Sequence, residues 1–224
     1  MISICIPTYE MHGEGATLLK RNFEALRTQT FKDFEVVITD NSDENMIKNL
    51  CAEEQYAVLT INYVKNPRKG MAQNTNEAIK KAKGDLIKIL YMDDFLAHEN
   101  ALREIADNFK GHWLVTGCAH DNGSGTRTNP HFPKYTDKIG LGKNTIGSPS
   151  VLTIKNENPL LFDEKMTWLL DCDYYKRLYE KYGKPVILDT INVVIGLGKH
   201  QTTNYLSDAQ KQNEQEYMTQ KYEK

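Results

Sequence analysis

The sequence lacks the cysteine spacing and the charge excess that mark several protein classes. Its four cysteines, Cys5, Cys51, Cys118 and Cys172, are scattered, with no C-x-x-C pair and no histidine at ligand spacing. This pattern suits reduced thiols in a cytoplasmic protein better than disulfides or structural zinc. With 28 basic and 30 acidic residues, the formal net charge is -2. The composition therefore gives no argument for binding nucleic acid or a membrane surface.

Long apolar runs are also missing. No run approaches the ~20 residues that a membrane-spanning helix needs. The opening residues, MISICIPTYE, contain neither a basic segment nor an apolar stretch of useful length, so we expect no signal peptide. At 224 residues, the chain can bury a sizeable core as one large domain, or as one domain with a small annex. We expect a cytoplasmic protein without a transmembrane segment.

The common signatures of nucleotide sites and hydrolytic sites do not occur. There is no G-x-x-x-x-G-K-[ST] loop, and no G-x-G-x-x-G follows the first predicted strand. A serine nucleophile elbow and an H-E-x-x-H pair are missing too. These absences exclude a P-loop and a dinucleotide fingerprint.

What the sequence does contain is an alternation of short apolar runs and amphipathic segments. This pattern predicts a mainly parallel sheet with helices on both faces, an α/β fold. The predicted strands are 2–7, 34–40, 59–66, 85–94, 112–119 and 148–155, and residues 185–198 form another apolar run. The predicted helices are 16–29, 44–54, 71–84, 99–110 and 167–183.

Two segments depart from this alternation. Residues 120–144 are rich in Gly, Asn, Thr and Pro and show little periodicity. A loop of this length in a compact domain is usually functional or disordered, so we expect a lid over the ligand or a plain insertion. The polar tail from Ser207 is expected to be a peripheral helix or frayed chain.

Polar residues follow three predicted strands at the point where each ends. They are PTYE (7–10), DNSD (40–43) and YMDD (91–94). Ligands bind beyond the carboxyl ends of parallel strands, so we expect these residues at one rim. Burying Asp93 or Asp94 would be costly without a partner, so we expect a ligand or metal there. Carboxylate oxygens suit Mg²⁺ or Mn²⁺, which act with substrate phosphates and stabilise a phosphate leaving group.

These motifs together resemble family 2 glycosyltransferases of the GT-A fold. The resemblance rests on SICIPTYE, DFEVVITDNSDEN, the helix from Gly70 to Gly84 and LIKILYMDD. Further along, LLDCDYYKRL is similar to the family's acidic helix start, and GLGKHQTT to its late histidine segment. The resemblance covers residues 1–205 and implies a single GT-A domain. Residues 1–119 would bind the nucleotide sugar and 120–205 the acceptor, with 206–224 as a peripheral tail.

The resemblance also implies roles for individual residues. Asp171 would be the catalytic residue, Asp93 and His200 would hold the metal, and Asp94 and Trp168 would lie on the acceptor side. Asp40 would accept a hydrogen bond from the ring N–H of the base. The implied nucleotide-binding residues are Pro7, Thr8, Tyr9, Glu10, Asp40, Asn41, Ser42, Asn66, Arg68, Lys69, Gly70, Asn76, Tyr91, Met92 and Asp93. Asp40 also fits a plain turn residue, and Asp171 a plain helix N-cap.

Two positions depart from the family pattern. The family usually writes D-x-D-D at the end of the fourth strand, and here the first position is Tyr91. That first aspartate commonly contacts the ribose, so the substitution affects that contact. The acidic helix has Leu170 where glutamate is common, whereas Asp171, Asp173 and Arg177 keep the rest of the pattern.

The implied function is metal-dependent, inverting transfer of a sugar from a nucleotide-diphospho-sugar to an acceptor hydroxyl. A single carboxylate base fits inversion, because retention by double displacement needs a second, nucleophilic carboxylate. UDP is the favoured nucleotide, because an acceptor for one ring N–H suits uracil, although thymine offers the same edge. The cofactor would be Mn²⁺ or Mg²⁺. The residues leave the sugar, the acceptor and a homo-oligomeric state open.

Two functions from other classes are alternatives. A nucleotidyltransferase would also use carboxylates at strand ends, but it normally needs a glycine-rich basic loop after the first strand. Here the corresponding segment, PTYEMHGEG, is acidic. A catalytically silent nucleotide-binding module of GT-A type is the other alternative, and Tyr91 supports it.

Overall fold

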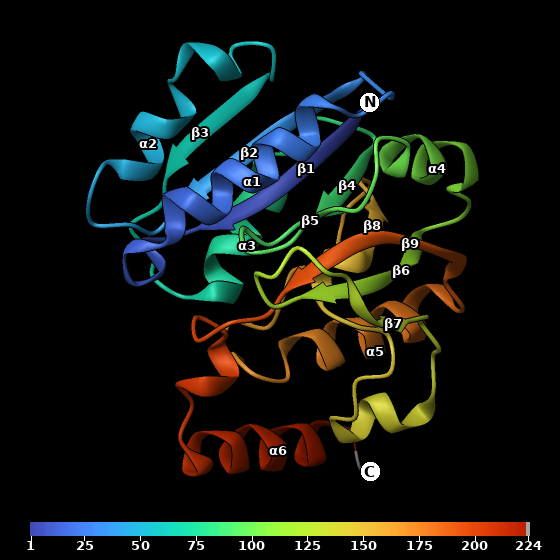
Figure 1. The fold of residues 1–224 in the computed structure, drawn as a ribbon. Coiled ribbons are helices and arrows are strands. Elements are labelled where there is room, and N and C mark those ends of the chain that lie inside the picture. Colours follow the sequence, from blue (N-terminus) through green and yellow to red (C-terminus); the bar gives the residue numbers. More distant parts are fainter. Residues whose placement is uncertain (223–224) are drawn as a thin grey trace.

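A nine-stranded sheet runs through the part of the chain that the structure, a computed structural model, describes: residues 1–222 (Figure 1). Its first half holds four parallel strands in the spatial order β3-β2-β1-β4. They are β1 (Ile2–Thr8), β2 (Phe34–Asp40), β3 (Ile61–Lys65) and β4 (Leu86–Ile89). β1 and β2 are buried along nearly their whole length, as continuous apolar runs in parallel sheets are. The predicted parallel α/β core is confirmed in this half.

The second half of the sheet is mixed. It contains β5 (Phe95–Leu96), β6 (Trp113–Asp121), β7 (Thr128–His131), β8 (Leu152–Lys155) and β9 (Val186–Gly196). β8 lies between β4 and β6 and is antiparallel to both, whereas β9 runs parallel to β6. The alternating sequence pattern predicted a mainly parallel sheet, in which β6 would run parallel to its neighbours. Instead, β8, which comes later in the chain, is inserted between β4 and β6, so spatial order departs from sequence order.

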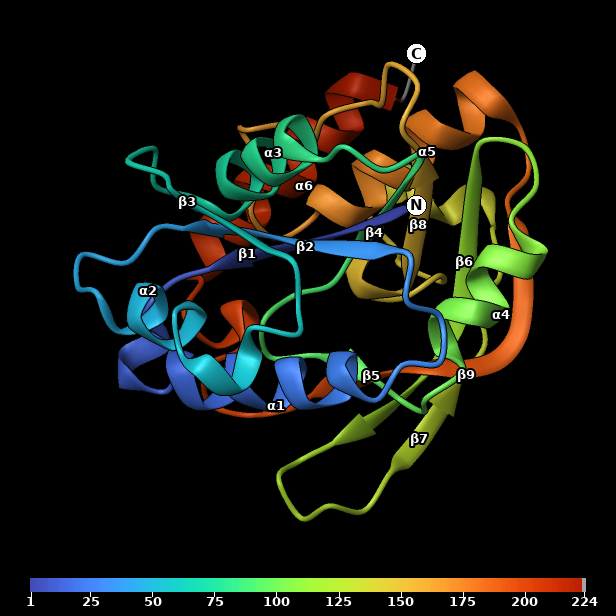
Figure 2. The ribbon, with the colours of Figure 1, turned by 90° about the horizontal axis from the view of Figure 1, so that it is seen from above.

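Helices cover both faces of the sheet (Figure 2). α3 lies on one side and α1 and α2 lie on the other. The helices are α1 (Gly15–Arg27), α2 (Met46–Cys51), α3 (Met71–Lys81), α4 (Ala101–Asn108), α5 (Leu170–Tyr182) and α6 (Asp208–Tyr222). Short 3-10 turns are η1 (Met11–Gly13), η2 (Glu54–Tyr56), η3 (Asp137–Leu141), η4 (Pro149–Val151) and η5 (Thr202–Asn204).

The segment 120–144, predicted to be a long loop, contains regular structure. β7 pairs with β6 as an antiparallel hairpin, which projects from the body of the protein in Figure 2. After the hairpin, Lys134 N–H donates to the Thr145 carbonyl at 2.9 Å, and η3 follows. Composition alone hid these elements, because Gly, Asn and Pro are weak strand formers and the pairing partner supplies the order.

The polar tail forms α6, the lowest element in Figure 1. Met218 is the residue of α6 that is buried. α6 approaches η3, where Gln215 Nε2 donates to the Leu141 carbonyl at 3.1 Å. The helix is therefore attached to the body both by this polar contact and by Met218, with Tyr217 and Tyr222 partly buried against the core.

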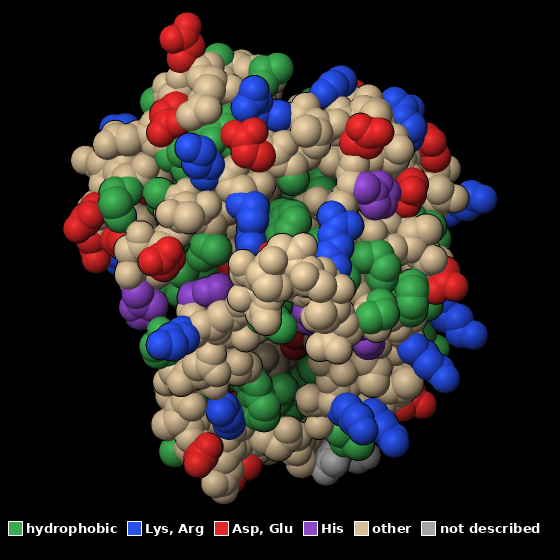
Figure 3. Space-filling view, viewed as in Figure 1, with side chains coloured by type: hydrophobic (Ala, Val, Ile, Leu, Met, Phe, Trp, Pro, Cys, Tyr) green, Lys and Arg blue, Asp and Glu red, His purple; other side chains and the backbone are tan. Residues whose placement is uncertain are grey.

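The surface and core agree with the composition. Basic and acidic side chains are interspersed on the face shown in Figure 3. All four cysteines are free thiols. Within residues 1–222, no helix combines the length and the apolar character that crossing a bilayer would require.

Lys88 on β4 is a basic residue that is fully buried. Its amine donates to the Ser150 carbonyl, and burial lowers the pKa of that amine to about 7.

The start of β4 depends on a close approach of two backbones at Gly84. A Cβ at this position would lie 2.7 Å from both the Met1 carbonyl oxygen and the Ser3 nitrogen. The Gly84 N–H also donates to Ser3 Oγ at 2.7 Å. These atoms belong to the chain entering β1, so they have little freedom to move.

We expect Gly84→Ala to lower the free energy of unfolding by about 1–3 kcal/mol through overpacking. For a chain of this size, that corresponds to a fall in Tm of roughly 3–10 °C, measurable by circular dichroism. Gly140→Ala is the matched control, because its new methyl would face the flexible Lys176 side chain at 3.3 Å. Equal melting temperatures for the two variants would contradict this expectation.

Candidate active site

A cavity of about 360 Å³ opens beyond the carboxyl ends of β1, β2 and β4. The strand ends thus meet at one rim, as expected for parallel strands in an open sheet. Nine of the predicted nucleotide-binding residues line it, and five other residues complete the wall. The lining residues are Pro7, Tyr9, Glu10, Met11, Asn41, Lys69, Gly70, Met71, Asn74, Tyr91, Met92, Asp93, Thr167 and Thr202.

A second cavity of about 190 Å³ adjoins the first. The two predicted acceptor-side residues, Asp94 and Trp168, line it together with the predicted catalytic residue Asp171. Five residues belong to both cavities: Met71, Tyr91, Asp93, Thr167 and Thr202. Asp93 therefore stands where the two spaces meet, and Asp171 faces the second space alone.

The two predicted metal ligands come together. His200 Nε2 lies 3.3 Å from Asp93 Oδ2, although 107 positions separate the residues in the chain. The contact with Asp93 raises the pKa of the His200 imidazole above its ordinary value. Residues 1–222 contain no cluster of three or more His, Cys, Asp or Glu side chains arranged to hold a metal. Two protein ligands still fit Mg²⁺ or Mn²⁺, which usually keep several waters and bind substrate phosphates.

The turn that carries Asp93 is held from behind by α1. Arg21 Nη2 donates to the Asp93 carbonyl at 2.6 Å, and its guanidinium lies 4.4 Å from the centre of the Phe95 ring. Asn22 Nδ2 donates to the Asp94 carbonyl at 2.7 Å. Gly196 on β9 packs so closely that a Cβ there would lie 2.2 Å from the Asp93 carbonyl oxygen. Neither Arg21 nor Asn22 was predicted to contact this turn, because nothing in the sequence pattern links α1 to it.

Asp94 points inward, away from water. It is 3% exposed, and its carboxylate accepts hydrogen bonds from the Gly196 N–H at 2.9 Å and from Ser148 Oγ at 3.3 Å. Burial, together with the charge of Asp93, raises the pKa of this carboxyl. Asp94 thus lines the second cavity while its oxygens are engaged by the protein.

Asp171 occupies the first turn of α5, where the helix dipole favours a negative charge. Its Oδ1 accepts from the Cys172 N–H at 2.6 Å, and its Oδ2 accepts from Asn144 Nδ2 at 2.6 Å. Burial raises the pKa of the Asp171 carboxyl to about 6, and the hydrogen bonds oppose that shift. Asn144, which the sequence did not single out, is therefore the residue that orients this carboxylate.

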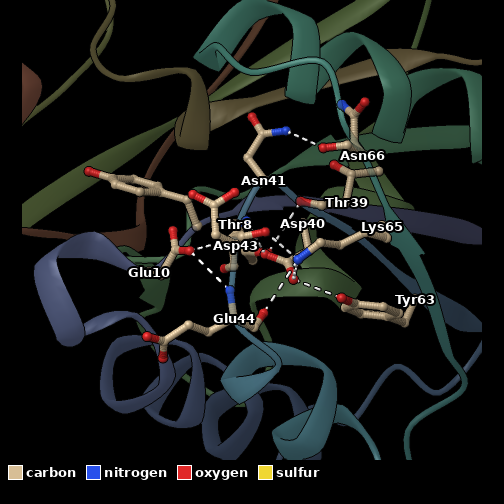
Figure 4. Close-up of polar contacts among 12 residues, drawn as sticks. Thr8, Glu10, Thr39, Asp40, Asn41, Asp43, Glu44, Tyr63, Lys65 and Asn66 are labelled. Atoms are coloured by element: carbon tan, nitrogen blue, oxygen red, sulfur yellow. Dashed lines mark hydrogen bonds and ion pairs between the residues drawn. The ribbon is translucent and has the colours of Figure 1, made fainter.

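The structure does not place the Asp40 carboxylate on either cavity (Figure 4). Asp40 is fully buried, and Tyr63 Oη donates to its Oδ2 at 2.7 Å. The Ser42 N–H donates to its Oδ1 at 2.9 Å, and Lys65 Nζ lies 3.5 Å from Oδ2. Both oxygens of the carboxylate are therefore engaged by protein donors.

The next residue, Asn41, lines the cavity instead. Asn41 Nδ2 donates to the Asn66 carbonyl at 2.8 Å and to the Arg68 carbonyl at 3.0 Å. Both partners are acceptors, so they fix the orientation of the amide. Among the described residues, none donates to Asn41 Oδ1. At the end of β2, the acceptor that faces the cavity is therefore the neutral amide oxygen of Asn41.

Six further predicted residues lie around the cavities and do not line them. Asn76 ties α3 to the chain before α5, because it exchanges two hydrogen bonds with the Phe162 backbone at 2.9 and 2.7 Å. Arg68 is paired with Glu164. The six residues are Thr8, Ser42, Asn66, Arg68, Asn76 and His200.

The family of this chain follows from comparison with known sequences. The sequence profile of the family described as Glycosyl transferase family 2 matches residues 3–181. The chain belongs to glycosyltransferase family 2.

Relatives of this family 2 glycosyltransferase come from several organisms. An uncharacterized glycosyltransferase of Methanocaldococcus jannaschii is 25% identical over 231 residues, which cover 98% of this chain and 78% of the relative. One from Haemophilus influenzae is 28% identical over 194 residues, which cover 83% of this chain and 63% of the relative.

Two solved structures show the same GT-A fold. Staphylococcus aureus TarS 1–349 in complex with UDP-GlcNAc matches with a TM-score of 0.66 at 19% identity, covering 92% of this chain and 62% of that TarS chain. The mannosyltransferase PcManGT of Pyrobaculum calidifontis, in complex with GDP-Man and Mn²⁺, matches with a TM-score of 0.61 at 16% identity. That match covers 88% of this chain and 56% of PcManGT. The glycosyltransferase chain thus spans about three fifths of these neighbours.

Tyr91 gives this glycosyltransferase a site that differs from the usual family pattern. Its ring lines both cavities, and its Oη atom is buried with no hydrogen-bond partner among residues 1–222. Burial raises the pKa of this phenol. A neutral hydroxyl therefore stands where the family commonly has a carboxylate.

We expect Asn144→Ala to raise the pKa of Asp171 further, because the variant removes a donor that stabilises the carboxylate. Hydrogen bonds to charged groups contribute about 1.5–3 kcal/mol when fully formed. Asp171 is only half-buried, so we expect the titration midpoint to rise by roughly 0.5–1 pH unit. The carboxyl ¹³C resonance, assigned with Asp171→Asn, measures this midpoint directly. Asn108→Ala on α4 is the control, and a midpoint that stays at the wild-type value would contradict the role of Asn144.

Proposed function

We propose that this glycosyltransferase moves a sugar from a nucleotide-diphospho-sugar to an acceptor hydroxyl, with inversion and with a divalent cation. The observation that carries the proposal is the pair of adjoining cavities that share Asp93. A nucleotide in the first cavity would bring its diphosphate to Asp93 and its sugar to the mouth of the second. An acceptor in the second cavity would then lie beside Asp171.

Asp171 is the best candidate for the general base. Three carboxylates line the second cavity, Asp93, Asp94 and Asp171. Asp93 lies beside His200, and the oxygens of Asp94 are engaged by Gly196 and Ser148. Asp171 is thus left to accept the proton of the acceptor hydroxyl. A single available carboxylate supports inversion rather than double displacement.

The proposed reaction is a direct displacement at the anomeric carbon of the donor sugar. The acceptor oxygen loses its proton to Asp171 and forms a bond to the anomeric carbon. The bond between that carbon and the diphosphate oxygen breaks, and the nucleoside diphosphate leaves. Asp93 and His200 would hold Mn²⁺ or Mg²⁺, which supplies Lewis-acid stabilisation of the departing diphosphate. The Mn²⁺ in the PcManGT complex supports this choice of cation.

We favour UDP as the nucleotide, with Asn41 in the place first given to Asp40. The free Oδ1 of Asn41 can accept the N3–H of uracil, since its Nδ2 is committed to the Asn66 and Arg68 carbonyls. The Tyr9 ring and Pro7 offer apolar surface on the same cavity. The UDP-GlcNAc complex of TarS supports the same donor class.

The acidic strand end argues against a nucleotidyltransferase. After β1, the carboxylate of Glu10 accepts from the backbone N–H groups of Asp43 and Glu44 (Figure 4). A negative charge therefore occupies the place where a phosphate-binding loop would need basic or glycine-rich chain. A silent binding module would hold UDP without ever releasing it from a UDP-sugar.

We expect Asp93→Ala to remove the gain in UDP affinity that Mn²⁺ gives the wild-type protein, because the cation would lose one of its two protein ligands. Isothermal titration of UDP with and without Mn²⁺ measures this gain. Asp107→Ala, which changes an exposed aspartate on α4, is the control. A metal-dependent gain that survives in Asp93→Ala would rule out Asp93 as the ligand.

We expect Asp171→Asn to lower kcat by about 10² or more, because removing a general base typically has this effect. Donor binding should stay within a few fold, since Asp171 lies outside the first cavity. In the wild type, kcat/KM should rise with pH through about 6, because the carboxyl must lose its proton to act as base. Release of UDP from UDP-sugars is the measurement. Equal losses of binding and turnover would make Asp171 structural, and a wild type that binds UDP but releases none would indicate the silent module.

A further inference from the structure

The last helix, α6, lies beyond the segment that the family profile matches, residues 3–181. One of its side chains nevertheless reaches the chain just before Asp171. Glu214 Oε1 accepts from the Thr167 N–H at 2.8 Å, and its Oε2 accepts from the N–H groups of Trp168 and Leu169 at 2.8 and 2.9 Å. One carboxylate thus binds three successive backbone amides.

These amides are the ones that precede α5. A helix start leaves its first N–H groups without partners inside the helix, and a side chain at the N-cap usually accepts one of them. The N-cap residue of α5 is Leu169, whose apolar side chain cannot accept. Of the three amides that Glu214 binds, that of Leu169 belongs to this helix start, and Glu214 reaches it from 45 residues further along the chain.

A second set of contacts holds the same region from the other end of α6. Lys221 Nζ lies 2.8 Å from Asp163 Oδ2 and 2.7 Å from Asp173 Oδ1. Tyr222 Oη donates to Asp173 at 2.6 Å, and Tyr217 Oη donates to Asp163 at 2.9 Å. α6 is therefore fixed to the chain on both sides of residues 167–169.

The segment held in this way forms the wall of the site. Thr167 lines both cavities, and Trp168 and Asp171 line the second. Asp171 follows Leu169 by two residues, so any shift of the Leu169 backbone changes the direction in which its carboxylate points. In oriented reactions, a displacement of about 1 Å can cost 10²-fold in rate.

We propose that Glu214 is a positioning residue for catalysis. Through it, α6 holds residues 167–169 in place and so orients Asp171. The proposal rests on the proposed function only where it assigns a role to Asp171. Glu214 lies neither on the first cavity nor on the second, so it acts through residues 167–169.

The test compares Glu214→Ala and Glu214→Gln with Glu216→Gln. Glu216 is an exposed glutamate on the same helix, and its carboxylate accepts a hydrogen bond from Gln212. Amide hydrogen exchange of residues 167–169 should become about tenfold faster in both Glu214 variants, since each loses hydrogen bonds to a charged acceptor. It should be unchanged in Glu216→Gln. If Glu214→Ala does not fold, Glu214→Gln decides, because it keeps one acceptor oxygen.

Kinetics separate positioning from plain support of the fold. In the Glu214 variants, kcat should fall about tenfold while the KM for the donor stays within about threefold, since the donor cavity keeps its β1 and β2 walls. The titration midpoint of Asp171 should also fall, because a looser wall admits water to a carboxylate whose burial raised its pKa. This direction is opposite to the one expected for loss of Asn144.

Three results would overturn the proposal. The first is exchange at 167–169 that matches the Glu216→Gln control. The second is a joint fall of Tm, donor affinity and kcat, which would mean that α6 only supports the fold. The third is an unchanged exchange rate at 167–169 together with an unchanged titration midpoint of Asp171. These two measurements decide even if the wild type transfers no sugar, a result that would contradict the proposed function and not the role of Glu214.

Discussion

The site depends on how two adjacent carboxylates are divided between protein and cavity. Asp94 is turned into the protein, where the Gly196 N–H and Ser148 Oγ donate hydrogen bonds to its carboxylate. Asp93 is thereby turned outward to the rim that both cavities share. Both residues lie in the turn that follows β4, where the Asp94 N–H donates to the Tyr91 carbonyl at 3.0 Å, so the orientation of one side chain constrains the other. Of the two carboxylates that follow the fourth strand, one is thus held inside the protein and the other lines both cavities.

The backbone around this pair has little freedom. α1 donates to the carbonyls of Asp93 and Asp94 through Arg21 and Asn22, and β9 approaches so closely that only glycine fits at position 196. The rest of the site is built outward from this fixed turn. His200 reaches Asp93 from the chain after β9, and Asp171 faces it across the second cavity. Elements from both ends of the chain therefore meet at one rigid point.

The sequence was informative wherever a functional residue sits at the end of a regular element. The strand ends carrying Tyr9 and Asp93 could be located because apolar runs stop there, and the parallel arrangement then brings them together. Family 2 membership, inferred from the order of the motifs, is confirmed. Locating Asp171 on the second cavity required the resemblance, since a carboxylate at a helix start has an ordinary structural explanation as well.

The sequence was uninformative where the choice depends on contacts between distant segments. Asp40 and Asn41 are neighbours, and only the packing of Tyr63 and Lys65 shows that the first is saturated while the second faces the cavity. Asn144 lies in a segment without periodicity, and Glu214 lies in a polar tail without an apolar face. Neither residue type nor spacing marks them, because their partners are 27 and about 45 residues away.

The common wall of the two cavities has a thermodynamic consequence. Because Met71, Tyr91, Thr167 and Thr202 contact both spaces, a ligand that orders these side chains in one cavity alters the free energy of binding in the other. Linkage requires the effect to be reciprocal: whatever factor the donor contributes to acceptor affinity, the acceptor contributes to donor affinity. If the donor binds one cavity and the acceptor the other, as we propose, each substrate would be an effector of the other without a separate regulatory site.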